Sequence, residues 1–279
     1  MIETPRVTIE DVTAVRGNGE GLVDLAERAV DRLAGRSPTE RLAGVIAATF
    51  SNPQRFPALS VRLAARLGLG PETPAFDVQM ACSAYPYALY LAGRLAADTG
   101  GRVLVVNGDV QSPLVDPSDH ATGGIFSDAV TATVVSASDE DTSEFAFLSR
   151  YDTALTCAAE GPIRMDGMKV FTFVATEVRQ FLQDFVARTV RHSADLFVPH
   201  QANPYMVRQL ARSLGLSDRL VALPDEMKNP GSCSIPLALA HLAEDPASRG
   251  RLLGARALLA GFGAGYSAAA ASVRIDLTR

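Results

Sequence analysis

The chain lacks the features of three classes of protein. It has no excess of basic residues, with 26 Lys and Arg against 31 Asp and Glu and a net charge of −5, so the balance does not suggest a nucleic-acid partner. No apolar run reaches the about 18 residues that a membrane-spanning helix needs. The first residues, MIETPRVTIED, do not have the pattern of a signal peptide. We therefore expect a cytoplasmic protein without a membrane or nucleic-acid partner.

Cysteine is also scarce. The chain has 3 cysteines in 279 residues, Cys82, Cys157 and Cys233. Three cysteines do not make a disulfide framework in a chain of this size, which agrees with a reducing compartment. The sequence predicts no metal site and no cofactor.

The remaining composition favours alternating α/β structure. Apolar residues make up 47% of the chain, and helices rich in Ala and Leu alternate with short β-branched strands. We expect helices over 21–34, 58–67, 83–98, 171–189, 204–214 and 234–242, and strands over 42–49, 75–80, 103–107, 129–135, 145–151, 196–199, 257–261 and 267–275. The acidic stretch SASDEDT, residues 136–142, divides the chain into predicted halves 1–140 and 141–279. The similar order of elements in both halves suggests a pseudo-duplication.

One cysteine lies where a predicted strand turns into a helix. In FDVQMACSAYPYALYLAGRL, residues 76–81 have the apolar pattern of a buried strand, and a helical pattern begins at Ser83. Cys82 would then lie in the positive field at the helix start, which favours the thiolate. A thiolate can take an acyl group from a thioester, although a lone buried cysteine is often inert.

The second half repeats this layout. LFVPHQANPYMVRQLARSLGL is an apolar strand, a polar cluster with His200 and Asn203, and an amphipathic helix, and EMKNPGSCSIPLALAHL places Asn229 in a turn-rich loop before another helix. His200 could be a core histidine and Asn229 a helix cap. A cysteine with His and Asn far away in sequence, each at the start of a helix, favours convergence of the three residues on one catalytic site.

These motifs carry a family resemblance. AFDVQMACSAYPYAL, VPHQAN, KNPGSCSIPLAL and the terminal LLAGFGAGYSAAAASVRI resemble the cysteine, histidine, asparagine and glycine motifs of β-ketoacyl-acyl-carrier-protein synthase III, in the thiolase-like condensing enzyme superfamily. The resemblance covers about Val45 to Ile275. It implies an α/β thiolase-like fold, five-layered α-β-α-β-α, from two pseudo-duplicated halves.

The resemblance also implies a decarboxylative Claisen condensation. Cys82 would be acylated by an acyl-CoA or acyl-carrier-protein thioester, and His200 and Asn229 would donate hydrogen bonds to the oxygen of a malonyl-type thioester. The amide of Cys82 and an amide of the turn Gly263, Ala264 and Gly265 would bind the oxyanion. The pathway would be fatty acid, polyketide or related secondary metabolism.

The resemblance implies roles for three other residues, on weaker motif matches. Phe56 would enter the partner subunit's acyl pocket in a homodimer, Phe262 would lie beside the nucleophile, and Asn203 would contact the pantetheine arm. Phe56 and Phe262 could equally be ordinary core residues. In the dimer, the strand 103–107 would pair with its twin.

The chain departs from the family at its beginning. The family has a first strand of pattern I-x-G-x-G and then a segment that contacts coenzyme A, whereas Met1 to Val15 offer only VTIEDVTAV. We therefore expect a shortened N-terminus, with the first strand replaced or supplied by a partner. Two alternatives stay open: acyl transfer to an oxygen or nitrogen nucleophile with His200 as general base, and a non-catalytic subunit of a heterodimeric ketosynthase. Retention of Asn229 favours condensation over transfer, and the intact Cys82, His200 and Asn229 favour an enzyme.

Overall fold

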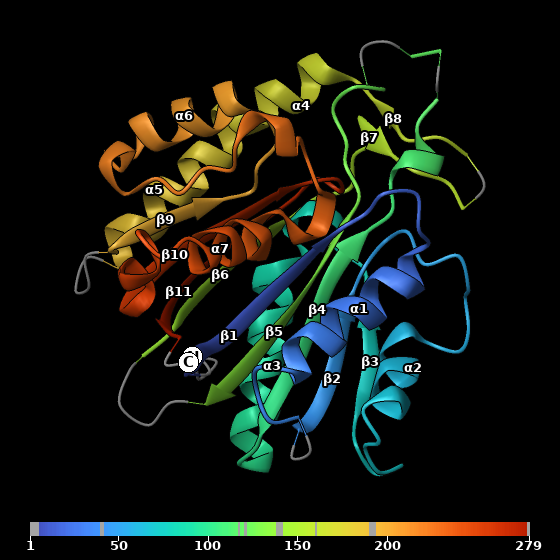
Figure 1. The fold of residues 1–279 in the computed structure, drawn as a ribbon. Coiled ribbons are helices and arrows are strands. Elements are labelled where there is room, and N and C mark those ends of the chain that lie inside the picture. Colours follow the sequence, from blue (N-terminus) through green and yellow to red (C-terminus); the bar gives the residue numbers. More distant parts are fainter. Residues whose placement is uncertain are drawn as a thin grey trace.

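The computed structural model describes residues 6–39, 42–116, 118–119, 122–137, 142–159, 161–189 and 194–277. Its main sheet has nine strands in the order β3-β2-β4-β5-β1-β11-β10-β9, with β6 paired to β11, and helices lie on its faces (Figure 1). The strands are β1 (Val7–Arg16), β2 (Leu42–Ala48), β3 (Ala75–Val78), β4 (Arg102–Asp109), β5 (Ala129–Ala137), β6 (Glu144–Ser149), β9 (Leu196–Pro199), β10 (Leu253–Gly263) and β11 (Ser267–Asp276), and a separate ribbon joins β7 (Leu155–Thr156) to β8 (Arg164–Met165). The helices are α1 (Leu22–Ala34), α2 (Leu59–Arg66), α3 (Ala84–Thr99), α4 (Gly167–Phe173), α5 (Arg179–Arg188), α6 (Pro204–Ser213) and α7 (Ser234–Glu244).

The two halves of the sheet have the same topology. The first half has the order β3-β2-β4-β5-β1, with β2–β4 parallel and β4–β5 and β5–β1 antiparallel. In the second half β9–β10 is parallel, and β10–β11 and β11–β6 are antiparallel. A parallel bridge from Phe197 to Leu220 supplies the counterpart of β3 beyond β9. The pseudo-duplication is therefore confirmed, whereas the proposed boundary at 140/141 lies outside the described residues and the domain ranges remain a prediction.

Three apolar cores separate the layers. One lies between α1 and α2 and strands β2, β4 and β5, a second surrounds α3 and α7 between the two halves of the sheet, and a third lies between β9–β11 and helices α4–α6. Successive side chains of β4 enter two of these cores in turn. Val103 and Val105 face the central core, and Leu104 and Val106 face the core beside α1 and α2. The sequence of layers is helix, sheet, helix, sheet, helix, as predicted.

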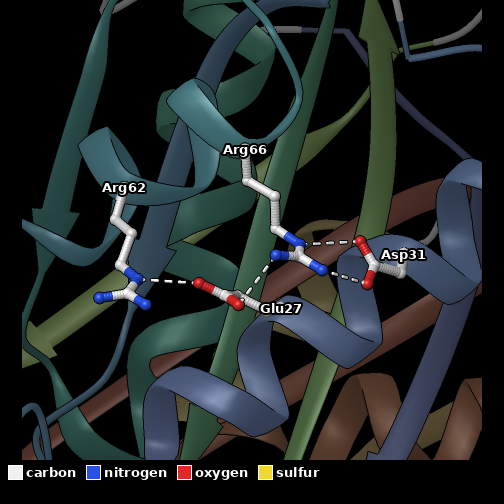
Figure 2. Close-up of polar contacts among 4 residues, drawn as sticks. All are labelled: Glu27, Asp31, Arg62 and Arg66. Carbon is white, nitrogen blue, oxygen red and sulfur yellow. Dashed lines mark hydrogen bonds and ion pairs between the residues drawn. The ribbon is translucent and has the colours of Figure 1, made fainter.

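Charged residues join the two helices of the first outer layer (Figure 2). Arg66 of α2 binds Asp31 of α1 through two hydrogen bonds of 2.9 and 2.6 Å, and its third nitrogen reaches Glu27 at 2.9 Å. Arg62 binds the other oxygen of Glu27 at 2.8 Å. The hydrogen bond from Arg66 lowers the pKa of the Asp31 carboxyl, so this stabilisation is present above the ordinary carboxyl pKa and is lost as the pH falls. The network fixes α2 against α1.

The expectation of a missing first strand is wrong. VTIEDVTAV forms most of β1, which pairs with β5 along its whole length and with β11 at Thr8 and Ile9. Nearly all of β1 is buried, so it has no polar face that would reveal a strand in the sequence. Two acidic residues, Glu10 and Asp11, interrupt its apolar residues; Asp11 is buried, and its carboxylate lies 2.6 Å from the hydroxyl of Ser37 and 3.2 Å from the guanidinium of Arg36. Residues 17–21 connect β1 to α1.

The proposed pairing of strand 103–107 with its twin is also wrong. β4 is an interior strand that uses one edge to bind β2 and the other to bind β5, so neither edge is free. The open edge of this half belongs to β3, which pairs with β2 and ends the strand order. Apolar composition alone could not distinguish an interior strand from an edge strand that is buried by a partner.

The predicted helices and strands otherwise match the structure apart from shifts at their ends. The largest shifts are at the start of the strand expected over 257–261, which begins at Leu253, and at the start of the helix expected over 171–189. That helix begins at Gly167 because the side chain of Asp166 accepts a hydrogen bond from the amide of Lys169 at 3.1 Å. It passes through a π-helical turn, Val174–Val178, into α5. None of the helices in the described part of the chain is long and apolar enough to cross a membrane.

Candidate active site

Cys82 lies in a tight turn between β3 and α3. A 3-10 turn, Ala81–Ser83, precedes the helix, and Ala81 has a φ of 43°, a strained value for a residue with a side chain. The turn packs directly on β10. A Cβ added at Gly261 would lie 2.8 Å from the Cα of Ser83, and one at Gly263 would lie 3.0 Å from the Cβ of Cys82. These two glycines therefore allow the nucleophile turn to rest on the strand.

The Cys82 side chain is buried, and this decides its protonation. Burial raises the pKa of the thiol to about 12, and the carboxylate of Asp109 contributes in the same direction. A backbone hydrogen bond at the turn acts the other way but is the smaller effect. The expectation of a thiolate does not agree with this structure, because desolvation by burial raises the pKa of the thiol. At neutral pH Cys82 is a thiol and needs a base.

His200 follows β9 and is fixed from two sides. Its amide donates to the carbonyl of Ala260 in β10 at 2.7 Å, and its ring meets Phe262 edge-on with 5.4 Å between ring centroids. Nδ1 lies 2.6 Å from the hydroxyl of Ser234 at the start of α7. Burial lowers the pKa of the imidazole to about 3, so the ring is neutral at physiological pH. Because Ser234 engages Nδ1, Nε2 is the nitrogen that remains for a reaction partner.

Asn229 is held by a short strand-like contact. Its amide donates to the carbonyl of Ile125 at 2.9 Å, and its carbonyl accepts from the amide of Ser127 at 3.0 Å. The side-chain oxygen accepts from the amide of Gly231 at 3.0 Å, which leaves the NH₂ group as the side-chain donor of this residue. Lys228, the residue before it, has a φ of 55°. Asn229 therefore does not cap α7, whose N-cap residue is Cys233.

These three segments meet at the ends of β4 and β10. The turn Ala81–Ser83 contacts the turn Gly231–Cys233, which follows Asn229 and precedes α7. Ser234, next in the chain, binds His200, and β10 contacts both His200 and Cys82. The structure thus brings the three candidate catalytic residues into one buried region where α3 and α7 begin.

Comparison with known proteins agrees with this arrangement. The family described as 3-oxoacyl-[acyl-carrier-protein (ACP)] synthase III matches residues 76–153, and its C-terminal counterpart matches residues 187–275. β-Ketoacyl-[acyl-carrier-protein] synthase III of Pseudomonas aeruginosa is 33% identical over 276 residues, which cover 91% of this chain and 82% of the relative. The chain belongs to the β-ketoacyl-acyl-carrier-protein synthase III family. It is therefore a condensing enzyme of the acyltransferase class.

Further relatives agree with this assignment. Synthase III 2 of Streptomyces coelicolor is 34% identical over 241 residues, 82% of this chain and 72% of the relative. The crystal structure of the synthase III from Pseudomonas aeruginosa superimposes with a TM-score of 0.86 at 26% identity, over 97% of this chain and 98% of that one. The thiolase-like fold of the synthase III family is therefore shared over almost the whole chain.

The other residues that the family motifs suggested occupy different surroundings. Phe262 is buried against His200, on the opposite side of β10 from the glycines that face Cys82. Asn203 caps α6, because its side-chain oxygen accepts from the amide of Met206 at 2.9 Å. Phe56 is 84% exposed and lies away from the buried core of its own chain. Ala264 and Gly265 form the turn after β10, which a hydrogen bond of 2.8 Å from Ser267 to the carbonyl of Ala264 closes.

Three polar residues that contact the candidate catalytic residues or their loops were not predicted from the sequence. Ser234 orients the histidine ring, and Asp109 and Gln111 bind the asparagine loop from the end of β4. The only signal was a change from apolar VLVV to polar NGDVQ at the end of a predicted strand. Within the described ranges, no group of three or more His, Cys, Asp or Glu side chains could hold a metal ion.

Proposed function

We propose that Cys82 carries an acyl group and that the enzyme condenses it with a malonyl-type thioester, with loss of carbon dioxide. The observation that carries this proposal is the orientation of two donors. In the tautomer whose Nδ1 accepts from the Ser234 hydroxyl, Nε2–H of His200 is left as a donor, and the bond from Gly231 to the side-chain oxygen of Asn229 leaves the NH₂ group as the other. Two preorganised donors on a thioester oxygen stabilise an enolate where its charge develops.

Acylation is the first half-reaction. The sulfur of Cys82 forms a bond to the thioester carbonyl, and the bond from that carbon to the sulfur of the donor breaks. For this step Nε2 of the neutral His200 ring is the unprotonated nitrogen, with Nδ1–H donating to Ser234; it accepts the thiol proton and passes it to the departing thiol, since a pKa of about 12 keeps free thiolate scarce. The other tautomer, in which Nδ1 accepts from the Ser234 hydroxyl and Nε2 carries the hydrogen, acts in the second half-reaction. In this proposal the amide of Cys82 and an amide of the turn Gly263, Ala264 and Gly265 bind the tetrahedral oxyanion.

Condensation is the second half-reaction. The bond between the carboxylate and the methylene carbon of the malonyl group breaks, carbon dioxide leaves, and the electron pair forms an enolate on the thioester. His200 and Asn229 hold the enolate oxygen. The carbanion then attacks the acyl carbonyl on Cys82, and the sulfur of Cys82 leaves and regains a proton. Acyl-CoA and acyl-carrier-protein thioesters are the proposed substrates, in fatty acid, polyketide or related metabolism.

The alternatives are less well supported. Acyl transfer to an oxygen or nitrogen nucleophile needs a base but no second donor on a thioester oxygen, whereas the backbone of Asn229 is fixed by hydrogen bonds and its side-chain oxygen is engaged by Gly231, which leaves its NH₂ group as a donor. A non-catalytic subunit has no need for a cysteine, histidine and asparagine brought together in this way. The heterodimer alternative also relied on a partner that supplies the first strand, and this chain forms that strand itself as β1.

Intact-protein mass measurement tests the proposal. The enzyme is incubated with a panel of acyl-CoA and acyl-carrier-protein thioesters, and then with malonyl thioester while carbon dioxide is measured. We expect one acyl group per chain, its loss on addition of malonyl thioester, and release of one carbon dioxide for each 3-oxoacyl product. Acylation followed by transfer to an alcohol or amine, without carbon dioxide, would favour the transferase instead.

We also propose a homodimer in which Phe56 completes the neighbour's acyl pocket. The exposure of the Phe56 ring and the open edge of β3, where Phe76 is 37% exposed, support this arrangement. Light scattering should give about twice 29.5 kDa. Phe56→Ala should shift acyl preference toward longer chains, while Val61→Ala, another exposed apolar residue, should not. A monomer at micromolar concentration that still acylates would contradict the proposal.

A further inference from the structure

We propose that Asp109 and Gln111 are positioning residues that hold Asn229 in place for decarboxylation. Asp109 is the last residue of β4 and Gln111 lies two residues beyond it, and together we term them the β4 clamp. The inference rests on the proposed role of Asn229 as an enolate donor and assigns to the clamp the placement of that donor. Neither residue is suggested to touch the substrate.

Gln111 binds the backbone on both sides of the asparagine contact. Its side chain is buried, and Nε2 donates to the carbonyl of Asn229 at 3.0 Å and to the carbonyl of Ser127 at 2.8 Å. The amide of Ser127 donates to the same Asn229 carbonyl, and its hydroxyl donates to the carbonyl of Met227 at 2.7 Å. One side chain therefore joins the asparagine loop to the segment that pairs with it.

Asp109 holds the next part of the loop. One oxygen of its buried carboxylate accepts from the amide of Ser232 at 2.9 Å, and the other accepts from the hydroxyl of Thr49 at 3.0 Å and the amide of Phe50 at 2.9 Å. Burial raises the pKa of the carboxyl, and these donors act in the opposite direction. Asp109 takes part in none of the ion pairs among the described residues, so hydrogen bonds supply its compensation.

The loop is pressed closely onto the clamp. A Cβ added at Gly231, whose φ is 67°, would lie 2.7 Å from Oδ2 of Asp109 and 3.1 Å from Nε2 of Gln111. On the other side of Asn229, Lys228 has a φ of 55° and a ψ of −150°, a conformation that strains a residue with a side chain. Strained backbone persists where its surroundings fix it, and here the clamp contributes that restraint.

The clamp and the nucleophile have different supports. Cys82 rests on Gly261 and Gly263 of β10, whereas Asn229 is held from β4. The nucleophile turn also contacts the turn Gly231–Cys233 that Asp109 holds, whereas the side-chain bonds of Gln111 end on Asn229 and Ser127. Loss of the Gln111 contacts should therefore displace the donor for decarboxylation and leave the acylated cysteine in place. Removal of the Asp109 charge also lowers the pKa of Cys82, because that carboxylate raises it, so acylation does not suffer electrostatically.

The test compares the two half-reactions in variants of the whole enzyme. Gln111→Leu removes both donors at similar size, and we expect kcat for carbon dioxide release from malonyl thioester to fall about tenfold, with KM and the acylation rate within about twofold. Asp109→Asn should likewise lower kcat for carbon dioxide release more than the acylation rate, and it replaces the first variant if that variant does not fold. Thr49→Val is the matched control. It removes a donor to Asp109 on the side away from the asparagine loop, and it should leave the ratio of carbon dioxide release to acylation unchanged.

A double-mutant cycle decides whether the clamp acts through Asn229. In an Asn229→Ala background, Gln111→Leu should cause no further loss of carbon dioxide release, because the donor it positions is already absent. Additive losses, or equal losses of acylation and decarboxylation, would overturn the inference. Wild-type enzyme that acylates without releasing carbon dioxide would overturn the proposed function itself, whereas full release by Gln111→Leu would overturn the clamp alone.

Discussion

Cys82→Ala protein should gain no mass with any acyl thioester, under conditions in which the wild-type chain gains one acyl group. The loss is complete because the side chain supplies the sulfur to which the acyl group bonds. The fold should survive, since the change removes one atom from a turn that is held by its backbone and by the hydrogen bond of 2.7 Å between Ser83 and Ser267. Intact-protein mass and thermal unfolding measure the two outcomes.

The other cysteines provide the controls. Cys157 is exposed and Cys233 is buried beside the carbonyls of Ala129 and Pro230. Cys157→Ser should acylate as the wild type does. A Cys82→Ala protein that still gains an acyl group, with the label mapped to Cys157 or Cys233, would refute the assignment of the nucleophile.

Most of the fold could be predicted because helices and strands in this chain follow simple patterns. Amphipathic helices such as α1 and α6 show the helical period, and the short strands between them are β-branched. β1 was missed because both its faces are buried and Asp11 interrupts its apolar residues. The predicted place of β4 at a dimer edge was wrong, because strand order depends on contacts between distant segments and a local sequence pattern does not contain that information.

The site shows the same division between local and distant information. Cys82, His200 and Asn229 could be selected as candidates because each lies in a recognisable motif at a junction that leads into a helix. Their protonation could not be predicted, because it depends on burial: the pKa of Cys82 rises to about 12 and that of His200 falls to about 3. The contacts of Asp109 and Gln111 could not be predicted either, since their partners Ser232 and Asn229 are more than 100 positions away in the chain.

Substitution of the two proposed enolate donors should separate the half-reactions. Asn229→Ala should acylate at the wild-type rate but lose carbon dioxide release by about a hundredfold, since removal of one preorganised donor costs about 3 kcal/mol. His200→Ala should lose carbon dioxide release to a similar degree and keep measurable, slower acylation, because the imidazole also relays the thiol proton. Mass measurement follows the first step and trapped carbon dioxide the second.

Ser234→Ala is the matched control for the histidine. It leaves the imidazole in place but removes the partner of Nδ1, so decarboxylation should fall less than in His200→Ala. The pH profile of the wild type adds an independent check. Burial lowers the pKa of His200 from 6.5 to about 3, so the ring gains no proton as the pH falls through 6.5 and carbon dioxide release should show no step there. Unchanged release by Asn229→Ala would instead support acyl transfer, because that reaction has no enolate for Asn229 to hold.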